Sequence, residues 1–175
     1  MVHTNIEFKA RCSNPEKIKE ILNSRNADYK GTDQQVDTYF KVNSGRLKIR
    51  EGLIEKALIY YERENSKEPK LSNVTLYPLD SNSSSLLKEI LSKSLEILVV
   101  VSKQRAIYYI NNIKFHIDIV EELGSFLEVE AIDTDGTIRI ENLQEQCNSF
   151  LDIFGINEED LISSSYSDLL LRKKP

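Results

Sequence analysis

The chain has 175 residues, of which 40% are hydrophobic and 29% are charged, and its formal net charge at pH 7 is −5. This composition is typical of one folded, water-soluble domain, and the acidic balance argues against a nonspecific nucleic-acid binder, which needs a basic surplus. No apolar run approaches the roughly 20 residues of a membrane-spanning helix, and the first residues lack a signal-peptide layout, so we expect a cytoplasmic protein with no membrane association.

The first part of the chain is predicted to combine strands with one short helix. Strict alternation of apolar and polar residues predicts a strand at 4–12. Asn14 and Pro15 are a typical helix start, and apolar residues at helical spacing continue to about residue 26. We expect the chain to turn at Gly31. Four further strands are predicted between turn residues, at 35–42, 46–51, 57–64 and 73–77.

The second part of the chain is predicted to contain three strands and the remaining helices. Serine-rich residues 81–85 are expected to form a loop and cap before an amphipathic helix that contains Leu86, Leu87, Ile90 and Leu91. Three stretches rich in β-branched residues predict strands at 97–110, 114–120 and 125–132. Helical spacing returns from 138 to 154 and again at 165–171, and we expect this C-terminal part to pack against the outside of the strands.

These elements predict a mainly β protein with flanking helices, an α+β fold. Short connections indicate antiparallel neighbours, and eight strands are enough for such a sheet to close around side chains or one small ligand. We therefore expect a closed eight-stranded antiparallel barrel, with its strands at about 4–132 and its C-terminal helices at about 138–171. The whole chain, 1–175, is expected to form one domain.

The cysteines and histidines offer little for metal chemistry. Cys12 and Cys147, together with His3 and His116, show no metal-ligand spacing, so a zinc site has almost nothing to draw on. We expect both thiols to be reduced and structural. His116 is interpreted as a hydrogen-bonding residue of a charged strand face.

Charged residues share faces of the predicted strands. Basic residues gather on the first, third, fourth and sixth strands, whereas acidic residues gather on the seventh and eighth. These faces are either solvated outer surfaces or the lining of one interior site; separation of the two signs by strand favours the interior site. Their members are Glu7, Lys9, Arg11, Arg46, Lys48, Arg50, Arg63, Lys103, Arg105, His116, Asp118, Glu128 and Glu130.

An interior with this charge pattern suits a triphosphate. Lysine and arginine donate to phosphate oxygens, while carboxylates hold Mg²⁺ or Mn²⁺, which bridges those oxygens. The sequence contains no Walker-type lysine motif, so side chains rather than backbone amides would hold the phosphates.

A series of short motifs runs along nearly the whole chain. They are Asn-Ile-Glu-Phe-Lys at 5–9, Asp-Thr-Tyr-Phe at 37–40, Gly-Arg-Leu-Lys-Ile-Arg-Glu at 45–51, Tyr-Glu-Arg at 61–63, Lys-Gln-Arg at 103–105, His-Ile-Asp at 116–118, Gly-Ser-Phe-Leu-Glu-Val-Glu at 124–130 and Ser-Tyr-Ser-Asp-Leu-Leu at 165–170. In this order they resemble the CYTH superfamily, also called triphosphate tunnel metalloenzymes. Within it, they are most similar to the class IV adenylate cyclase-like branch, which is related to thiamine triphosphatase.

The resemblance implies a tunnel that binds ATP, thiamine triphosphate or tripolyphosphate with Mg²⁺ or Mn²⁺, and, by analogy with cyclase-like members, a homodimer. Carried over by position, the phosphate contacts fall to Lys9, Arg11, Lys48, Arg50, Arg63, Lys103 and Arg105. The metal contacts fall to Glu7, Asp118, Glu128 and Glu130. Lys9, Arg63 and Tyr39 are the catalytic candidates, while for Tyr166 packing is favoured over catalysis.

One residue departs from the family pattern and leaves two functions open. The family motif Glu-x-Glu-x-Lys begins here with Asn5, whose carbonyl oxygen can bind a hard cation but lacks the charge of a carboxylate. The leading hypothesis is an enzyme that cleaves a phosphoanhydride bond, as a cyclase or a triphosphatase. The alternative is a nucleotide- or polyphosphate-binding module without turnover. A purely structural barrel is a third, for which Lys48→Glu and Arg50→Glu would leave triphosphate affinity unchanged.

Overall fold

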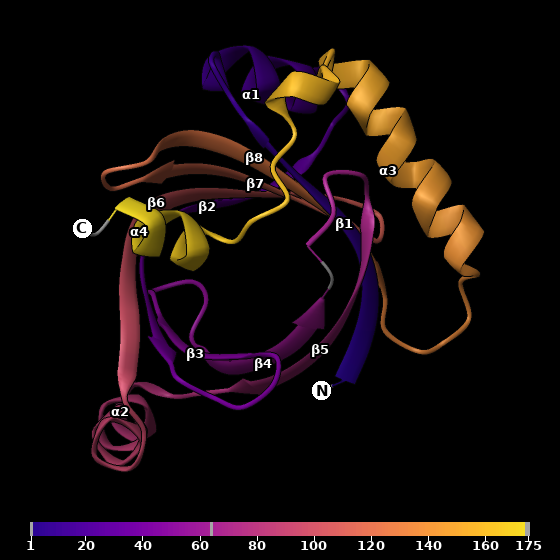
Figure 1. Ribbon diagram of the computed structural model, residues 1–175. Helices are drawn as coiled ribbons and strands as arrows, with labels where there is room; N and C mark the ends of the chain where they lie inside the picture. The colour runs from indigo at the N-terminus through magenta and orange to yellow at the C-terminus, as the bar shows by residue number, and fades with distance from the viewer. Residues whose placement is uncertain (1, 64, 174–175) are drawn as a thin grey trace.

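The strands close into a ring in the computed structural model, which describes residues 2–63 and 65–173 (Figure 1). Around the barrel the order is β1-β5-β4-β3-β2-β6-β7-β8, every neighbouring pair is antiparallel, and β8 pairs back with β1. The predicted fold class, a closed eight-stranded antiparallel barrel with flanking helices, is confirmed. Glu64, expected as the last residue of the fourth strand, lies outside the described residues.

The element bounds extend several of the predicted strands. The strands are β1 (Val2–Arg11), β2 (Asp28–Phe40), β3 (Arg46–Glu51), β4 (Ala57–Arg63), β5 (Lys70–Pro78), β6 (Ile97–Ile110), β7 (Ile113–Val120) and β8 (Gly124–Asp133). The helices are α1 (Pro15–Ser24), α2 (Ser81–Ser94), α3 (Ile140–Phe154) and α4 (Tyr166–Lys173), and a short 3₁₀ turn, η1, covers Glu158–Asp160.

One hydrophobic cluster lies outside the barrel wall, between the strands and the helices, and a second, which includes Tyr39, Phe126 and Tyr166, lies on the inner side. Leu127, Val129 and Ala131 on the outer face of β8 are fully buried, in one cluster with Leu143 and Phe150 of α3. Figure 1 shows α3 running along the outside of the barrel. Because the apolar strand faces are used here, the charged faces of the same strands point into the barrel.

Two of the predicted turns form part of regular elements instead. Gly31 lies inside β2, at a β-bulge where the pairing with β6 shifts register, and its φ of 123° is one that side chains rarely allow. The serine-rich residues are the first turn of α2 and not a loop. Asp80 caps this helix, because its carboxylate accepts a hydrogen bond from the backbone N–H of Ser83 at 2.7 Å.

The C-terminal helix departs from the expected packing on the outside of the barrel. In Figure 1, α4 lies across the end of the barrel that faces the viewer, whereas α3 lies outside it. Tyr166 is buried and enters the interior, where it stacks against Phe126 with ring centroids 5.0 Å apart. A short segment whose apolar side includes an aromatic residue can therefore close a barrel end as well as cover its wall.

Among the described helices, none has the length and apolar character needed to cross a membrane.

Cys12 and Cys147 are both free and buried, as the sequence predicted.

Candidate functional site

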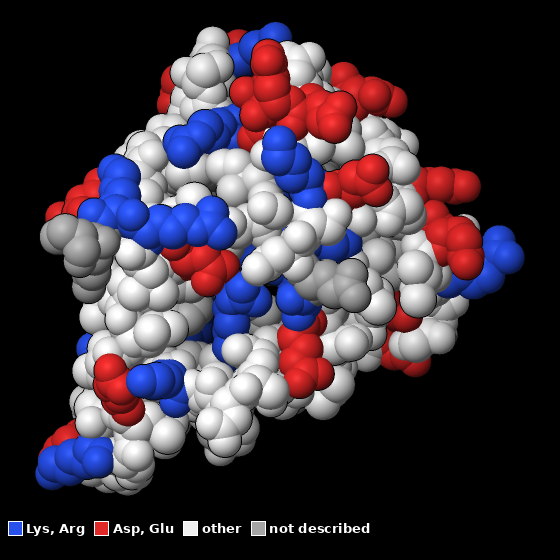
Figure 2. Space-filling model, viewed as in Figure 1, with Lys and Arg blue, Asp and Glu red and all other residues white. Residues whose placement is uncertain are grey.

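A cavity of about 460 Å³ runs inside the barrel, and its lining combines lysines, arginines and glutamates with tyrosines and aliphatic side chains. Figure 2 shows lysine, arginine and carboxylate atoms in the hollow at the centre of this face. The volume falls in the roughly 300–1,000 Å³ range of small-molecule sites. The charged strand faces therefore form one interior site instead of a set of solvated surfaces.

Strand register sets which charges meet. In the pairing of β1 with β8, Glu7 lies opposite Glu130 and Lys9 lies opposite Glu128. In the pairing of β7 with β8, Lys114 lies opposite Glu130 and His116 lies opposite Glu128. Since paired residues point to the same side of a sheet, Glu130 is flanked by Glu7 and Lys114, and Glu128 by Lys9 and His116.

Asp37 of β2 gathers the basic residues of the neighbouring strands. Its carboxylate accepts hydrogen bonds from Lys48 Nζ at 2.9 Å, from Arg50 Nε at 2.9 Å and from Lys103 Nζ at 2.6 Å. Burial alone would raise the pKa of Asp37, but the cations of Arg50, Lys103 and Lys48 outweigh it and hold the pKa well below its usual range. One ionised carboxylate thus positions three cations in the cavity wall.

Arg105 of β6 forms a second cluster with acidic partners. It donates two parallel hydrogen bonds to Asp118, at 2.7 and 2.6 Å, and a third to Glu128 at 2.9 Å. Tyr166 donates to the same Asp118 carboxylate at 2.7 Å. Asp118 is fully buried beneath these partners and does not line the cavity. It bonds Arg105 and Tyr166 and is not grouped with His116, Glu128 and Glu130, so the structure does not bring Asp118 to the metal candidates as the resemblance implied.

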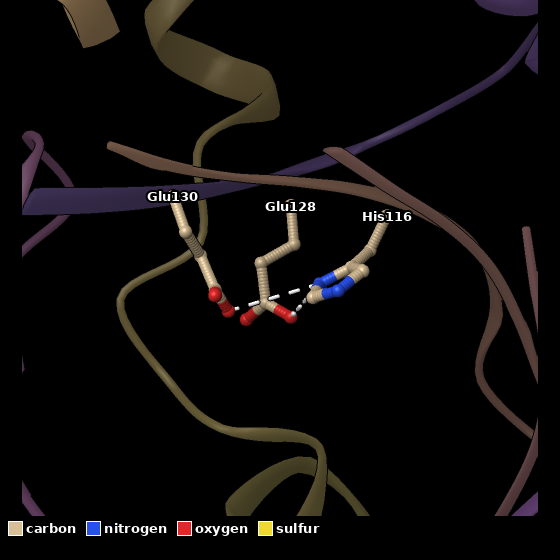
Figure 3. A group of neighbouring side chains, drawn as sticks. All are labelled: His116, Glu128 and Glu130. Carbon is tan, nitrogen blue, oxygen red and sulfur yellow. Dashed lines mark hydrogen bonds and ion pairs between the residues drawn. The ribbon is translucent and has the colours of Figure 1, made fainter. Parts of the chain in front are cut away.

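Three side chains next to Arg105 form a candidate metal site (Figure 3). One ligand atom from each of His116, Glu128 and Glu130 lies within 4.8 Å of the others. Burial, with Arg105 and Lys114 nearby, lowers the pKa of His116 to about 3, so its imidazole is neutral at pH 7 and has a lone pair to offer. Burial and the adjacent Glu128 raise the pKa of Glu130 to about 7.

These residues fit a divalent cation. The two carboxylates are typical donors for Mg²⁺ or Mn²⁺, and Nδ1 of His116, 3.4 Å from Glu128 and 3.7 Å from Glu130, adds a nitrogen that transition metals accept more readily than Mg²⁺. A cation there would lower the pKa of Glu130, because opposite charge favours the ionised carboxylate.

The wall formed by β1, β5 and β4, which continues from β8, holds further groups with unused hydrogen-bonding capacity. Arg63 of β4 donates from Nη1 to Glu7, but its Nε and Nη2 have no partner among the described residues although both are buried. The side-chain oxygens of Asn5 and Ser72, paired across β1 and β5, also have none. Because buried polar groups are normally satisfied, these atoms indicate where a polar ligand would bind.

The cavity wall includes most of the residues named from the sequence. Those that line it are Glu7, Lys9, Tyr39, Lys48, Arg50, Arg63, Lys103, Arg105, His116, Glu128, Glu130 and Tyr166. Arg11 does not line it. This residue is exposed where β1 ends, with its guanidinium 5.4 Å from the ring of Phe126.

The sequence of this barrel also matches a known family. The model of the CYTH domain matches residues 3–166. The chain belongs to the CYTH domain family. This confirms the resemblance seen in the motifs. A comparison with curated proteins found no match.

Solved structures share the fold of this CYTH domain. The PH1012 protein of Pyrococcus horikoshii is 25% identical with a TM-score of 0.74, and the match covers 94% of this chain and 98% of that one. A Vibrio parahaemolyticus protein proposed to be an adenylate cyclase is 17% identical, with a TM-score of 0.73 and coverage of 95% and 97%. A Hippeastrum protein with a dominant triphosphatase activity is 15% identical, with a TM-score of 0.64 and coverage of 99% and 97%.

Three charged residues of the site, Asp37, Lys114 and Glu55, were given no role from the sequence of this CYTH domain. Asp37 and Lys114 alternate with other inward-facing residues of β2 and β7, so strand periodicity could have found both. His116 lines the cavity and bonds Glu128 at 3.4 Å, as a hydrogen-bonding wall residue would, and it also lies in the candidate metal group with Glu128 and Glu130. Glu55 lies in the turn between β3 and β4, where no periodicity marks which way a side chain points.

Proposed function

We propose that this CYTH domain is a divalent-metal-dependent enzyme that binds a triphosphate in its tunnel and cleaves a phosphoanhydride bond. The observation that carries the proposal is the cavity itself, in which a cluster of lysines and arginines lies beside His116, Glu128 and Glu130. Membership of the CYTH domain family supports a triphosphate-acting enzyme.

The basic residues would bind the triphosphate. Lys48, Arg50 and Lys103 are fixed by Asp37, so they are already oriented before a ligand arrives. Arg63 offers its buried Nε and Nη2, which have no partner within residues 2–63 and 65–173. Charge-assisted hydrogen bonds to phosphate are each worth about 1.5–3 kcal/mol, and preorganisation lowers the entropic cost of forming them.

The acidic residues would hold Mg²⁺ or Mn²⁺. Glu130 and His116 have the freest donor atoms, while Glu128 is also bonded by Lys9 at 3.0 Å and by Arg105 at 2.9 Å. Glu7, bonded to Arg63, is the next carboxylate along the wall. A bound cation would bridge phosphate oxygens and neutralise charge that develops on them.

Tyr39 and Lys9 would act as donors in the reaction. Burial, with Asp37 nearby, raises the pKa of Tyr39 far above its ordinary value, so its hydroxyl keeps its proton at neutral pH. The Tyr39 oxygen accepts from Lys48 at 3.2 Å, which leaves that proton free for a phosphate oxygen. Lys9 lies between Glu128 and the ring of Tyr166, 4.0 Å from the ring centre, and can stabilise negative charge on the leaving phosphate.

A binding module without turnover is the second candidate, and Asn5 favours it. This residue lines the cavity where the family motif has a glutamate, so one negative charge is missing from the acidic side. A weaker metal site would leave a tunnel that holds a triphosphate without cleaving it.

Incubation of the protein with Mg²⁺ or Mn²⁺ and, separately, ATP, thiamine triphosphate and tripolyphosphate tests the proposal, with the products separated by chromatography. Cyclic AMP with pyrophosphate identifies a cyclase, since a ribose hydroxyl has attacked the α-phosphorus. Orthophosphate identifies a triphosphatase, since water has attacked a terminal phosphorus. Intact ligands from all three reactions, with binding retained, would support the binding module.

A further inference from the structure

Glu55 extends from the turn between β3 and β4 into the cavity and contacts two of its cations. Its carboxylate accepts from Arg50 Nη1 at 2.9 Å and from Lys114 Nζ. It also accepts from Gln35 Nε2 at 3.0 Å. Arg50 belongs to β3 and Lys114 to β7, and β2 and β6 lie between these strands in the barrel. The carboxylate therefore bridges the interior instead of pairing neighbouring strands.

The turn that carries Glu55 is anchored to the barrel wall. The Asp33 carboxylate accepts from the backbone N–H of Leu53 at 2.7 Å and from that of Glu55 at 3.0 Å. At Gly52 an added Cβ would lie 2.3 Å from the Asp33 side chain, so the backbone of the turn sits directly against that carboxylate. The side chain of Glu55 is thus placed at the cavity by its own turn, and Arg50 and Lys114 then hold it.

Glu55 differs from the other acidic partner of Arg50. The Asp37 side chain is 1% exposed and lies within strand β2, so it cannot leave without breaking the wall. The Glu55 side chain is 20% exposed and lies on a turn. Burial alone would raise the pKa of Glu55, but Arg50 and Lys114 outweigh it and hold the pKa well below its usual range, so the group is charged at neutral pH.

We propose that Glu55 occupies part of the triphosphate site in the unliganded protein and is displaced from Arg50 and Lys114 when a triphosphate binds. The inference rests on the proposed function. An anionic ligand must replace both contacts, so the carboxylate is an internal competitor that sets the affinity. Without Glu55, Lys114 would lose its hydrogen-bonded carboxylate and Arg50 would keep Asp37 alone, so the same contact stabilises the empty tunnel.

Calorimetric titration of Glu55→Gln with tripolyphosphate tests this. The dissociation constant should fall by about tenfold or more relative to wild type. The reason is that the ligand no longer has to break a charge-assisted hydrogen bond made by Glu55, and one such bond is equivalent to about that factor. The unliganded variant should melt at a lower temperature, and the rise in melting temperature on adding tripolyphosphate should be larger than in wild type.

Glu51→Gln is the matched control. It removes the same charge four residues earlier in the chain. Glu51 does not line the cavity, and its carboxylate pairs with Lys88 of α2 at 2.6 Å. Its dissociation constant should stay within about twofold of wild type, since exposed pairs contribute little. Glu55→Asp replaces Glu55→Gln if that variant fails to fold. Aspartate keeps the charge, but its shorter side chain extends less far across the interior. Its affinity for tripolyphosphate should lie between that of wild type and a tenfold higher value.

The outcomes separate this inference from the proposed function. Tighter binding in Glu55→Gln with no change in Glu51→Gln supports the competitor. Equal or weaker binding in Glu55→Gln or Glu55→Asp, with wild type binding normally, overturns it and assigns Glu55 a purely structural role. No binding by wild type or by any variant would overturn the proposed function, and the inference would fail with it.

Discussion

Arg63 is the cation of the cavity with the most unused hydrogen-bonding capacity, since two of its buried N–H groups have no partner among the described residues. Arg63→Gln should weaken tripolyphosphate binding by about 1.5–3 kcal/mol, roughly 10- to 150-fold, in calorimetric titrations. Arg11→Gln is the matched control, because Arg11 is exposed outside the cavity; its affinity should stay close to that of wild type. Equal losses in both variants would mean that long-range charge, not contact, governs binding.

In the candidate metal site, the carboxylate of Glu130 has no cationic side chain at hydrogen-bond distance among the described residues. Nδ1 of His116 lies 3.7 Å from it. Glu130→Gln keeps the shape of the side chain but removes its charge, so metal-dependent turnover should be lost while the circular dichroism spectrum stays unchanged. Glu121→Gln, on the exposed turn after β7, should keep wild-type turnover. Turnover at the wild-type rate in Glu130→Gln would show that Glu130 is not a metal ligand.

Lys103 should make triphosphate binding depend on pH. Burial lowers its pKa from 10.5 to about 7, only partly opposed by Asp37. The charged or titratable groups that face it include Asp37, Lys48, Arg50, Arg105, Asp118 and Tyr166. Since the amine must be protonated to bind phosphate, affinity should fall as pH rises above about 7, and it should fall less in Lys103→Met. Parallel pH profiles for the two proteins would exclude Lys103 as the titrating group.

The same group contributes to stability with a defined sign. Its pKa is lower in the folded than in the unfolded state, so between about pH 7 and 10.5 the unfolded chain binds more protons. The contribution of Lys103 to the free energy of unfolding therefore rises with pH across this window.

At the scale of elements, α4 and the barrel depend on each other through Tyr166. Its hydroxyl donates to Asp118 at 2.7 Å, and burial together with Asp118 keeps the pKa of Tyr166 well above its ordinary value. Tyr166→Phe should lower the free energy of unfolding in urea by about 1.5–3 kcal/mol, the usual value for a hydrogen bond to a charged group. The control is Tyr29→Phe, because the hydroxyl of Tyr29 bonds Thr32 at the surface. This variant should change the free energy of unfolding by less than about 0.5 kcal/mol.

Elements with a strong period could be predicted from the sequence, whereas those defined by tertiary contacts could not. The alternation of β7 and β8 placed His116, Glu128 and Glu130 on inward faces without any structure. Gly31 was expected to turn the chain, because a bulge and a turn demand the same backbone freedom of glycine. The position of α4 was missed because amphipathicity shows that one face of a helix is buried, but not whether that face packs on the outer wall of the barrel or over its open end.

At the scale of the whole molecule, closure of the barrel accounts for both the predicted and the missed parts of the site. Residues that the strand period turns inward meet across the cavity once the eight strands close, so most basic residues were found from sequence. The bridges of Asp37 and Glu55 join three or more chain segments, and no local pattern encodes such partners. Arg11 follows the same alternation as Lys9, but β1 ends there and the side chain leaves the interior.

The most direct test of the account is a calorimetric titration of wild type and Lys48→Glu with tripolyphosphate in EDTA, so that no metal-dependent turnover occurs. Lys48→Gln is used instead where the charge reversal unfolds the protein. The account predicts one tripolyphosphate per chain in wild type, with a micromolar dissociation constant, and a loss of at least about tenfold in affinity in the variant. Equal affinity in the two proteins would contradict it, because the basic residues of the tunnel would then not bind the ligand.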